Sequence, residues 1–349
     1  MKFLNTNGKA IRIQCVFTDA KEKNAKSRGC NTRLIKRWGG FLRLKSKLKK
    51  FGIVFVKDKP DLFLCDNYSV KGIIRHNKPF IIQEVVDCSV MLDKKVLRNS
   101  NCLAVFKNHI LRNKSENNSP TLCKRYHSKI INDFYKSESF KLDNEASYTD
   151  KQLDKIKCVL WDITHGPLSE FYSKLRKAEV NFSEKRDVDV LCCLTTSYSS
   201  IFSELIEWHR KMAIKEVEEM DNITSITEKI DKKSYMSALF NAKIVISPWG
   251  YGEYCYRDIE GMLAGAIVIK PDTSFVETIP DIYQNDITYV PCKADFSDLK
   301  EKIQKVLDHW EEYREMRIKV RNMLMDICNE AVIAKQYAKN VKDVLKIKQ

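Results

Sequence analysis

The sequence contains little glycine and proline, with 11 Gly and 8 Pro among 349 residues. This excludes collagen-like and low-complexity chains, and the 44% content of hydrophobic residues excludes an intrinsically disordered chain. The longest apolar stretch, around residues 261–269, is far shorter than the roughly 20 residues of a membrane-spanning helix. Residues 1–10 lack the apolar core of a signal peptide. We therefore expect a globular, cytoplasmic protein.

Metal-binding motifs are also missing. The chain has 12 cysteines but no Cys-x-x-Cys pair, and none of its six histidines stands four residues from another. Several cysteines lie inside apolar runs, as Cys192 and Cys193 do, which is typical of reduced thiols in a protein core. We expect neither a disulfide framework nor a structural zinc site.

Acidic residues are scarce at the amino terminus. Residues 1–60 contain 17 lysines and arginines but only three acidic residues, and the whole chain has a net charge of +15. Apolar residues recur at helical spacing from Leu34 through Trp38 to Phe51, with basic residues between them, although Gly39-Gly40 interrupts the pattern. The segment 33–51 thus predicts a basic amphipathic helix. Its lysines could be solvated on an ordinary domain helix, contact an anionic membrane surface, or face nucleic acid.

The length of the chain indicates two domains, because single domains cluster at about 100 to 200 residues. Short β-branched runs alternate with helical segments in both halves, which predicts α/β architecture with parallel sheets. We expect two Rossmann-like domains facing a cleft, at 1–180 and 181–330, and a carboxyl-terminal helix at 331–349 that packs back on the first domain. The expected strands are 11–17, 52–56, 61–65, 79–86, 102–107, 188–194, 223–226, 243–247, 266–269 and 287–290. The expected helices are 32–50, 200–218, 232–241, 256–264, 295–311 and a long tail at 313–348. Residues 113–120 are expected to form a polar loop.

The most informative stretch begins where the strand 243–247 ends. Gly250 and Gly252 lie in the loop that follows, and a short helix then runs towards Gly265. Backbone N–H groups exposed by the two glycines and the positive end of the helix would together bind a phosphate or diphosphate. The spacing is not that of a dinucleotide fingerprint, because a third glycine is missing.

Two charged side chains on this helix sharpen the prediction. Arg257 lies in the first turn, where a cation opposes the helix dipole unless an anion compensates it. That anion could be a bound diphosphate or an internal carboxylate such as Glu253, Asp258 or Glu260. Glu260 could accept hydrogen bonds from the hydroxyls of a ribose, or be solvated or ion-paired.

Residues 241–322 resemble the carboxyl-terminal domain of glycosyltransferases of the two-Rossmann (GT-B) fold. The group-1-like and spore-maturation-type families are the most similar, and exostosins are more loosely similar. The resemblance depends on Ser247-Pro248 before the glycine loop, on the segment Arg257-Asp258-Ile259-Glu260-Gly261-Met262-Leu263-Ala264-Gly265-Ala266, and on Phe275-Val276-Glu277-Thr278. It covers less than a quarter of the chain.

The resemblance implies transfer of a sugar from a nucleotide-sugar donor to a glycan or other hydroxyl acceptor, with the nucleotide bound by the second domain and the acceptor mainly by the first. Glu260 matches the family glutamate that holds the donor ribose. Glu253 precedes Glu260 by seven positions rather than the family's eight, so it is carried only as a candidate. The predicted donor-binding residues are Gly250, Tyr251, Gly252, Glu253, Arg257, Glu260 and Lys270.

The fold family generally needs no bound metal and no permanent cofactor. The one Asp-x-Asp triplet, Asp187-Val188-Asp189, precedes its strand, whereas ligands gather at the carboxyl ends of strands. An inverting reaction would need a base, for which the candidates are His76 and Asp87. The sequence does not separate inverting from retaining chemistry.

Two alternatives remain open. The basic amino-terminal segment is compatible with a nucleic-acid-binding protein, although the chain has no zinc finger or recognised RNA-binding motif. A degenerate site would leave a non-catalytic nucleotide or sugar binder. Contact of the basic segment with a membrane would make the protein membrane-associated.

Overall fold

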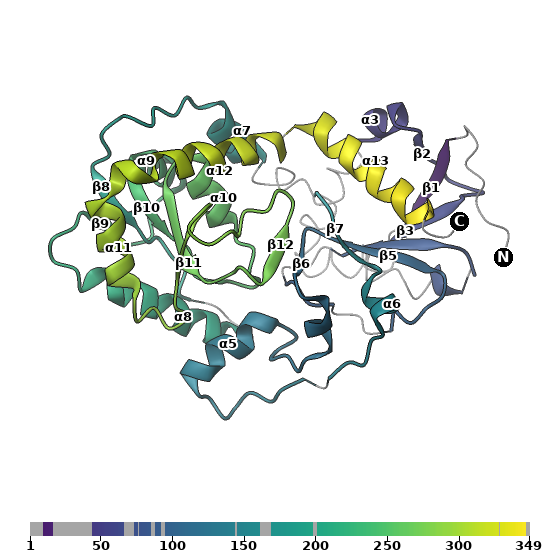
Figure 1. The fold of residues 1–349 in the computed structure, drawn as a ribbon, viewed down its shortest axis with the longest axis horizontal. Coiled ribbons are helices and arrows are strands. Elements are labelled where there is room, and N and C mark those ends of the chain that lie inside the picture. Colours follow the sequence, from purple (N-terminus) through teal and green to yellow (C-terminus); the bar gives the residue numbers. More distant parts are fainter. Residues whose placement is uncertain are drawn as a thin grey trace.

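Two parallel β-sheets, formed one after the other along the chain, make up the core (Figure 1). The computed structural model describes residues 10–16, 44–65, 73–75, 77–84, 88–91, 95–143, 145–160, 169–197, 201–327 and 329–346. The six-stranded sheet has the order β2-β1-β3-β4-β5-β7, formed by β1 (Ile11–Val16), β2 (Ile53–Phe55), β3 (Leu62–Cys65), β4 (Phe80–Gln83), β5 (Cys102–Lys107) and β7 (Ile156–Cys158). The five-stranded sheet has the order β13-β11-β10-β8-β9, formed by β8 (Val188–Leu191), β9 (Ser225–Ile226), β10 (Ala242–Ile246), β11 (Ile267–Pro271) and β13 (Val290–Cys292). Every pairing in both sheets is parallel, which confirms the predicted fold class.

Helices cover both faces of the five-stranded sheet, as the apolar character of its strands requires. On one face, Ile244 and Ile246 pack against α8 (Ile201–Glu218) and α11 (Leu299–Asp308). On the other face, Val245 and Val268 pack against α9 (Lys232–Asn241), α10 (Tyr256–Leu263) and α12 (Arg314–Ile327). The result is a three-layered unit with an apolar cluster on each side of the sheet.

The strand order reverses between β8 and β10. After β8 the chain adds β9 on one side of it, and it then returns through α9 to add β10 on the other side. Because α8 and α9 cover opposite faces, the chain diverges at the carboxyl ends of β8 and β10. In open α/β sheets such a switch point is where ligands bind.

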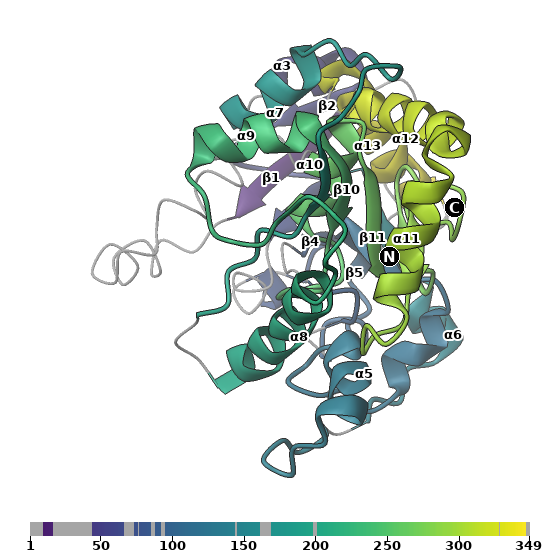
Figure 2. The ribbon, with the colours of Figure 1, turned by 90° about the vertical axis from the view of Figure 1, so that its left-hand side faces the viewer.

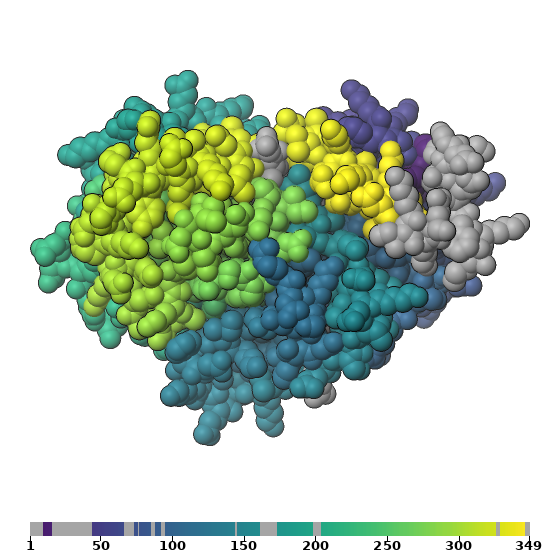
Figure 3. Space-filling model, in the orientation of Figure 1, coloured from purple at the N-terminus to yellow at the C-terminus, as the bar shows by residue number. Residues whose placement is uncertain are grey.

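Several contacts join the two halves of the molecule, and three of them are between helices and strands. β6 (His109–Leu111) pairs in antiparallel fashion with β12 (Val276–Thr278). α5 (Tyr126–Tyr135), although it lies between two strands of the first half in sequence, packs on α8 (Figure 2). α13 (Glu330–Lys346) packs on the six-stranded sheet, where the Tyr337 ring meets the Phe106 ring edge-on at 5.5 Å. Figure 3 shows the two halves in close contact on the visible face.

The elements differ from the prediction in several places. The helix expected at 32–50 is described only from residue 44, where α3 (Lys45–Lys50) lies; the rest of the basic segment is outside the described residues. The strand predicted at 287–290 begins later than expected: Ile287 lies in an exposed turn, and β13 starts only at Val290. The polar loop contains a short 3-10 helix, η1 (Lys114–Asn118). The long helical tail divides into α12 and α13, and the Asn329 side chain accepts a hydrogen bond from the backbone N–H of Ala331 at 2.9 Å. The sequence pattern also missed β6, β7, β12, α5, α6 (Asp150–Leu153) and α7 (Ser169–Lys177).

Candidate functional site

The loop from Ser247 to Cys255 crosses the carboxyl edge of the five-stranded sheet between β10 and α10. Its residues are largely buried, and the loop folds on itself through a hydrogen bond from the Gly250 N–H to the Gly252 carbonyl at 3.1 Å. The Gly250 N–H, which the sequence predicts to bind a phosphate, thus has an acceptor within the loop. The next helix, α10, begins at Tyr256, and the N–H of the preceding residue, Cys255, donates to Asp258 Oδ2 at 3.0 Å.

Asp258 is the centre of a buried network that fixes this loop. Its carboxylate accepts hydrogen bonds from the hydroxyls of Ser247 and Tyr283, and Lys270 Nζ lies 3.2 Å from Oδ2. Lys270 is fully buried and also donates to the Ser247 carbonyl at 3.4 Å. Lys270, predicted as a donor-binding residue, thus neutralises a buried carboxylate inside the core.

Two guanidinium groups lie together where β8 and β10 end. Arg210 of α8 is only 8% exposed and donates from Nη1 to the Thr195 carbonyl at 2.9 Å. Burial and the neighbouring charge of Arg257 lower the pKa of Arg210 to about 10. Arg257 lies in the first turn of α10, which follows the loop after β10, and its charge opposes the rise that burial causes in the pKa of Cys193. The like charges of the two arginines therefore interact at the switch point.

Arg257 is incompletely satisfied by the described part of the chain. Its Nη1 is buried, and no described residue accepts a hydrogen bond from it. Burial favours the neutral guanidine, but the nearby groups, Glu260 among them, raise the pKa of Arg257, so the side chain is charged. A buried, charged donor without an acceptor is costly, and an anion bound beside it would offset that cost.

Gly250 is needed in this arrangement for space. A Cβ at this position would stand 3.0 Å from Arg210 Nη2 and 3.8 Å from Cys255 Sγ. Any larger residue would therefore displace the Arg210 guanidinium. The glycine loop shapes the cationic site by allowing a side chain of α8 to approach it.

Glu260 lies at the edge of the same site, on α10 one turn after Arg257. It is 8% exposed, and Oε2 accepts a hydrogen bond from the Tyr235 hydroxyl of α9 at 2.8 Å. Burial and the Glu260 charge raise the pKa of Tyr235, so this hydroxyl stays protonated and donates to the carboxylate. The Tyr235 contact fixes the carboxylate next to the cationic pair.

Glu253 occupies a different environment, where the two halves meet. Its carboxylate is fully buried and accepts hydrogen bonds from the Ser89 N–H at 3.0 Å and the Ser89 hydroxyl at 2.8 Å. His127 Nδ1 lies 3.1 Å from Oε1, and His109 Nε2 lies 3.5 Å from Oε2. Burial alone would raise the pKa of Glu253, but the two histidines hold it well below its usual range. The structure thus surrounds Glu253 with side chains of the first half.

Tyr251 is 39% exposed at the rim of the loop, and its carbonyl accepts a hydrogen bond from Arg125 Nε at 2.6 Å. Gly252 is buried beside it. His127 of α5 also reaches the loop, with Nε2 3.1 Å from the Gly250 carbonyl. The segment that carries α5 therefore supports the glycine loop from the first half.

The remaining candidates lie elsewhere. His76 and Asp87 are outside the described residues. Asp189 of the Asp-x-Asp triplet lies at the amino end of β8, where it accepts a hydrogen bond from the Thr224 N–H and pairs with Lys243 at 2.7 Å. Within the described part of the chain, no three His, Cys, Asp or Glu side chains are grouped as metal ligands.

Sequence reasoning missed Arg210, although a signal was present. Ile206, Ala213 and Val217 of α8 are buried at helical spacing, and Arg210 falls on that same stripe. A charged residue on the buried face of a helix requires a partner, and here it marks the site.

No protein-family model matches this chain, and no curated protein matches it. Solved structures that resemble it include TarM, with 13% sequence identity and a TM-score of 0.43 over 81% of this chain and 54% of TarM, so the chain spans about half of that protein. An alpha-glucosyltransferase in complex with UDP-glucose and DNA containing an abasic site has 10% identity and a TM-score of 0.43, over 97% of this chain and 99% of that one. Anabaena Alr3699/HepE in complex with UDP has 10% identity and a TM-score of 0.42, over 96% of this chain and 100% of that one. The fold assignment depends on the two sheets described above rather than on these likenesses.

Proposed function

We propose that this protein is a glycosyltransferase that uses a nucleotide-sugar donor. The observation that carries the proposal is the pair Arg210 and Arg257 at the switch point between β8 and β10, where Arg257 Nη1 is buried without an acceptor among the described residues. Arginine is the side chain best suited to a diphosphate, because its planar fork donates several hydrogen bonds to oxyanions. The two arginines would bind the diphosphate of the donor.

The same geometry supports a chemical role. In the transfer, the acceptor oxygen forms a bond to the anomeric carbon while the bond from that carbon to the β-phosphate oxygen breaks. The nucleoside diphosphate leaves with the bonding electrons, and the acceptor hydroxyl loses its proton to a base. Arg210 and Arg257 would stabilise the charge that develops on the leaving diphosphate, in a site from which water is largely excluded. Glu260, fixed by Tyr235, would hold the ribose hydroxyls.

The position of the two arginines assigns the donor and the acceptor to different parts of the chain. Residues 181–330 would bind the donor, residues 1–180 would bind a glycan or other hydroxyl acceptor, and the boundary would lie near residue 180. His76 and Asp87 remain the candidates for the base. We expect donor binding to need no divalent metal, because the two guanidinium groups supply the positive charge that a metal would otherwise provide.

The test begins with thermal denaturation in the presence of UDP, GDP, ADP and CMP. One of the diphosphates should raise the unfolding temperature with the metal chelator EDTA present, because a ligand that binds only the folded state stabilises it. The matching nucleotide sugar should then release that diphosphate during incubation with the protein. A shift without turnover of any donor would indicate a non-catalytic binder. No shift with any nucleotide would contradict the proposal.

A further inference from the structure

One face of α13 carries lysines at regular helical spacing. Lys335, Lys339 and Lys342 are exposed and follow one another at intervals of four and three residues, which places them on one side of the helix. The opposite side, including Tyr337 and Val341, is buried against the six-stranded sheet. The lysines therefore project from a helix that is packed on the sheet, and they point away from the core.

α3 lies beside α13 and extends the same surface. Lys47 forms an ion pair with Glu330 at the start of α13, and Lys342 Nζ lies 3.9 Å from where a Cβ of Gly52 would stand. α3 adds the exposed lysines Lys45, Lys49 and Lys50. We call the six exposed lysines of the two helices the lysine ridge: Lys45, Lys49, Lys50, Lys335, Lys339 and Lys342. Figure 1 shows the two helices next to each other at one end of the molecule.

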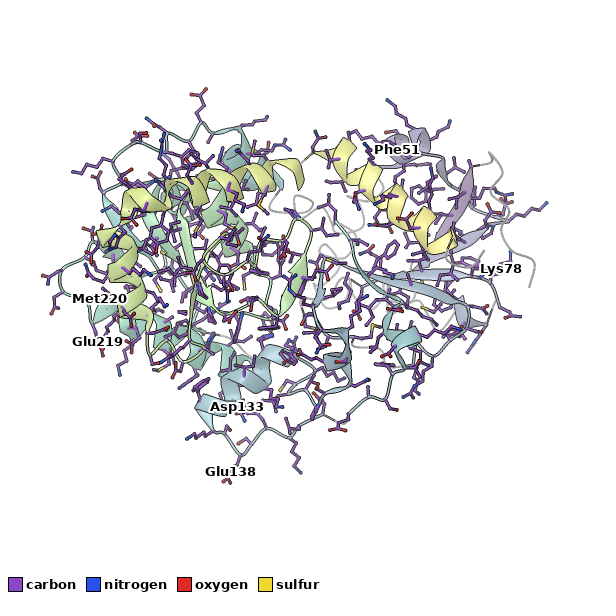
Figure 4. All side chains as sticks on the ribbon, viewed as in Figure 1. Phe51, Lys78, Asp133, Glu138, Glu219 and Met220 are labelled. Atoms are coloured by element: carbon purple, nitrogen blue, oxygen red, sulfur yellow. The ribbon has the colours of Figure 1, made fainter. Side chains whose placement is uncertain are left out.

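The positive charge of the lysine ridge is only partly balanced by its neighbours. Asp343 lies one turn after Lys339 on α13, and Glu330 is paired with Lys47, but in the described parts of the chain no carboxylate lies within ion-pair distance of any of the six lysines. In Figure 4, Phe51 marks the end of α3, while the labelled acidic residues Asp133, Glu138 and Glu219 lie at other edges of the molecule. The positive potential of the lysine ridge is therefore available to an anionic partner.

We propose that the lysine ridge binds the surface of anionic lipid bilayers. All six residues are lysines, which act as mobile point charges and suit a diffuse layer of headgroups, whereas nucleic-acid surfaces favour the directional fork of arginine. The large hydrophobic residues found exposed in the described chain include only Val332 on α13 and none on α3, so the lysine ridge offers no exposed aromatic platform for nucleic-acid bases. None of the described helices is long and apolar enough to cross a membrane, so the contact is peripheral. This proposal is independent of the nucleotide site.

Cosedimentation with lipid vesicles tests it. The full chain should bind vesicles of phosphatidylcholine and phosphatidylserine, bind phosphatidylcholine alone much more weakly, and dissociate as salt is raised. Each lysine near an anionic surface contributes roughly fivefold to the partition coefficient, so the variant K335E/K339E/K342E should lose on the order of 100-fold. The matched control K229E/K233E/K305E changes the net charge equally on exposed lysines of the five-stranded half, and it should bind nearly as the parent does.

Each other outcome overturns the proposal. Equal binding to both kinds of vesicle would show that the charge of the lysine ridge is not used. Equal losses in the two triple variants would show that only net charge matters. Tighter binding of the lysine ridge to a single-stranded oligonucleotide than to vesicles would assign it to nucleic acid. Urea unfolding of the variants checks that they are folded, and an unchanged thermal shift with nucleotide separates this test from that of the proposed function.

Discussion

Replacing Arg257 by glutamine separates the two explanations of this side chain. If Arg257 is held by internal carboxylates, its removal leaves buried charge unpaired, and breaking a buried pair costs about 3 to 5 kcal/mol of the free energy of unfolding. If the partner of Arg257 is instead a bound diphosphate, the substitution should lower the free energy of unfolding of the ligand-free protein only slightly. The substitution removes attraction to Glu260, but it also relieves repulsion of Arg210.

The repulsion between Arg257 and Arg210 can be bounded from the pKa of Arg210. A pKa lowered from 12.5 to about 10 makes the charged form of Arg210 about 3 kcal/mol less favourable than in water, with burial as the larger cause and Arg257 as the next. The relief and the lost attraction oppose each other, so we expect Arg257→Gln to lower the free energy of unfolding by less than the roughly 3 to 5 kcal/mol that breaking a buried pair costs. A hydrogen bond to a charged group is worth about 1.5 to 3 kcal/mol, so nucleoside diphosphate affinity should fall by roughly 10- to 150-fold.

Urea unfolding and isothermal titration with the nucleoside diphosphate measure the two quantities independently. Arg314→Gln is the matched control, because Arg314 is exposed on α12 and the chemical change is the same. It should alter neither quantity appreciably. A loss of about 3 kcal/mol or more in Arg257→Gln with nucleotide affinity intact would refute the diphosphate site.

Three further predictions concern the surroundings of the site. Gly250→Ala should weaken nucleotide binding several-fold, because the added Cβ would displace the Arg210 guanidinium. In Gly261→Ala the added Cβ would meet two valine side chains at 3.0 to 3.2 Å in the core, so this variant should lose about 1 to 3 kcal/mol of the free energy of unfolding and keep its nucleotide affinity. Isothermal titration and urea unfolding of both variants measure these effects. Burial lowers the pKa of His209 to about 3, whereas in the unfolded chain this histidine has a pKa of about 6.5 and takes up a proton below that pH. The stabilising effect of the neutral His209 is fully present above pH 6.5, and the free energy of unfolding falls by about 1.4 kcal/mol per pH unit from there towards pH 3. Urea unfolding of His209→Gln should lack this slope. The pKa of Glu253 is lower in the folded protein than in the unfolded chain, so its carboxylate stabilises the fold above the unfolded pKa, and this stabilisation is lost as acid protonates it. Glu253→Gln should reduce the free energy of unfolding by about 2 to 4 kcal/mol at neutral pH. Below about pH 4.5 the free energy of unfolding of this variant should vary less with pH than that of the parent.

The fold could be predicted where hydrophobic periodicity and length agree. The helix predicted at 232–241 matches α9, and the strand predicted at 102–107 matches β5. β6 and β12 were missed because each has only three residues and is stabilised by the other, across a separation of more than 160 positions. Such short strands carry too little local pattern for a sequence to show them.

In the candidate site, too, features formed by consecutive residues could be predicted and contacts between distant residues could not. The glycine loop and Arg257 could be located because strand, loop and helix are consecutive in the chain. Glu253 could not be placed, because its surroundings come from Ser89, His109 and His127, which only the folded chain brings to it. The contact of Lys270 with Asp258 could not be predicted for a related reason, since burial beside Asp258 is a property of the packed sheet and not of the local sequence.

A crystal structure with the bound nucleoside diphosphate would show directly which residues hold its phosphates. We expect phosphate oxygens within hydrogen-bonding distance, about 3 Å, of Arg257 Nη1 and the Arg210 guanidinium, with the ribose hydroxyls near Glu260. A nucleotide bound elsewhere, with both guanidinium groups still covered by protein atoms, would contradict this expectation.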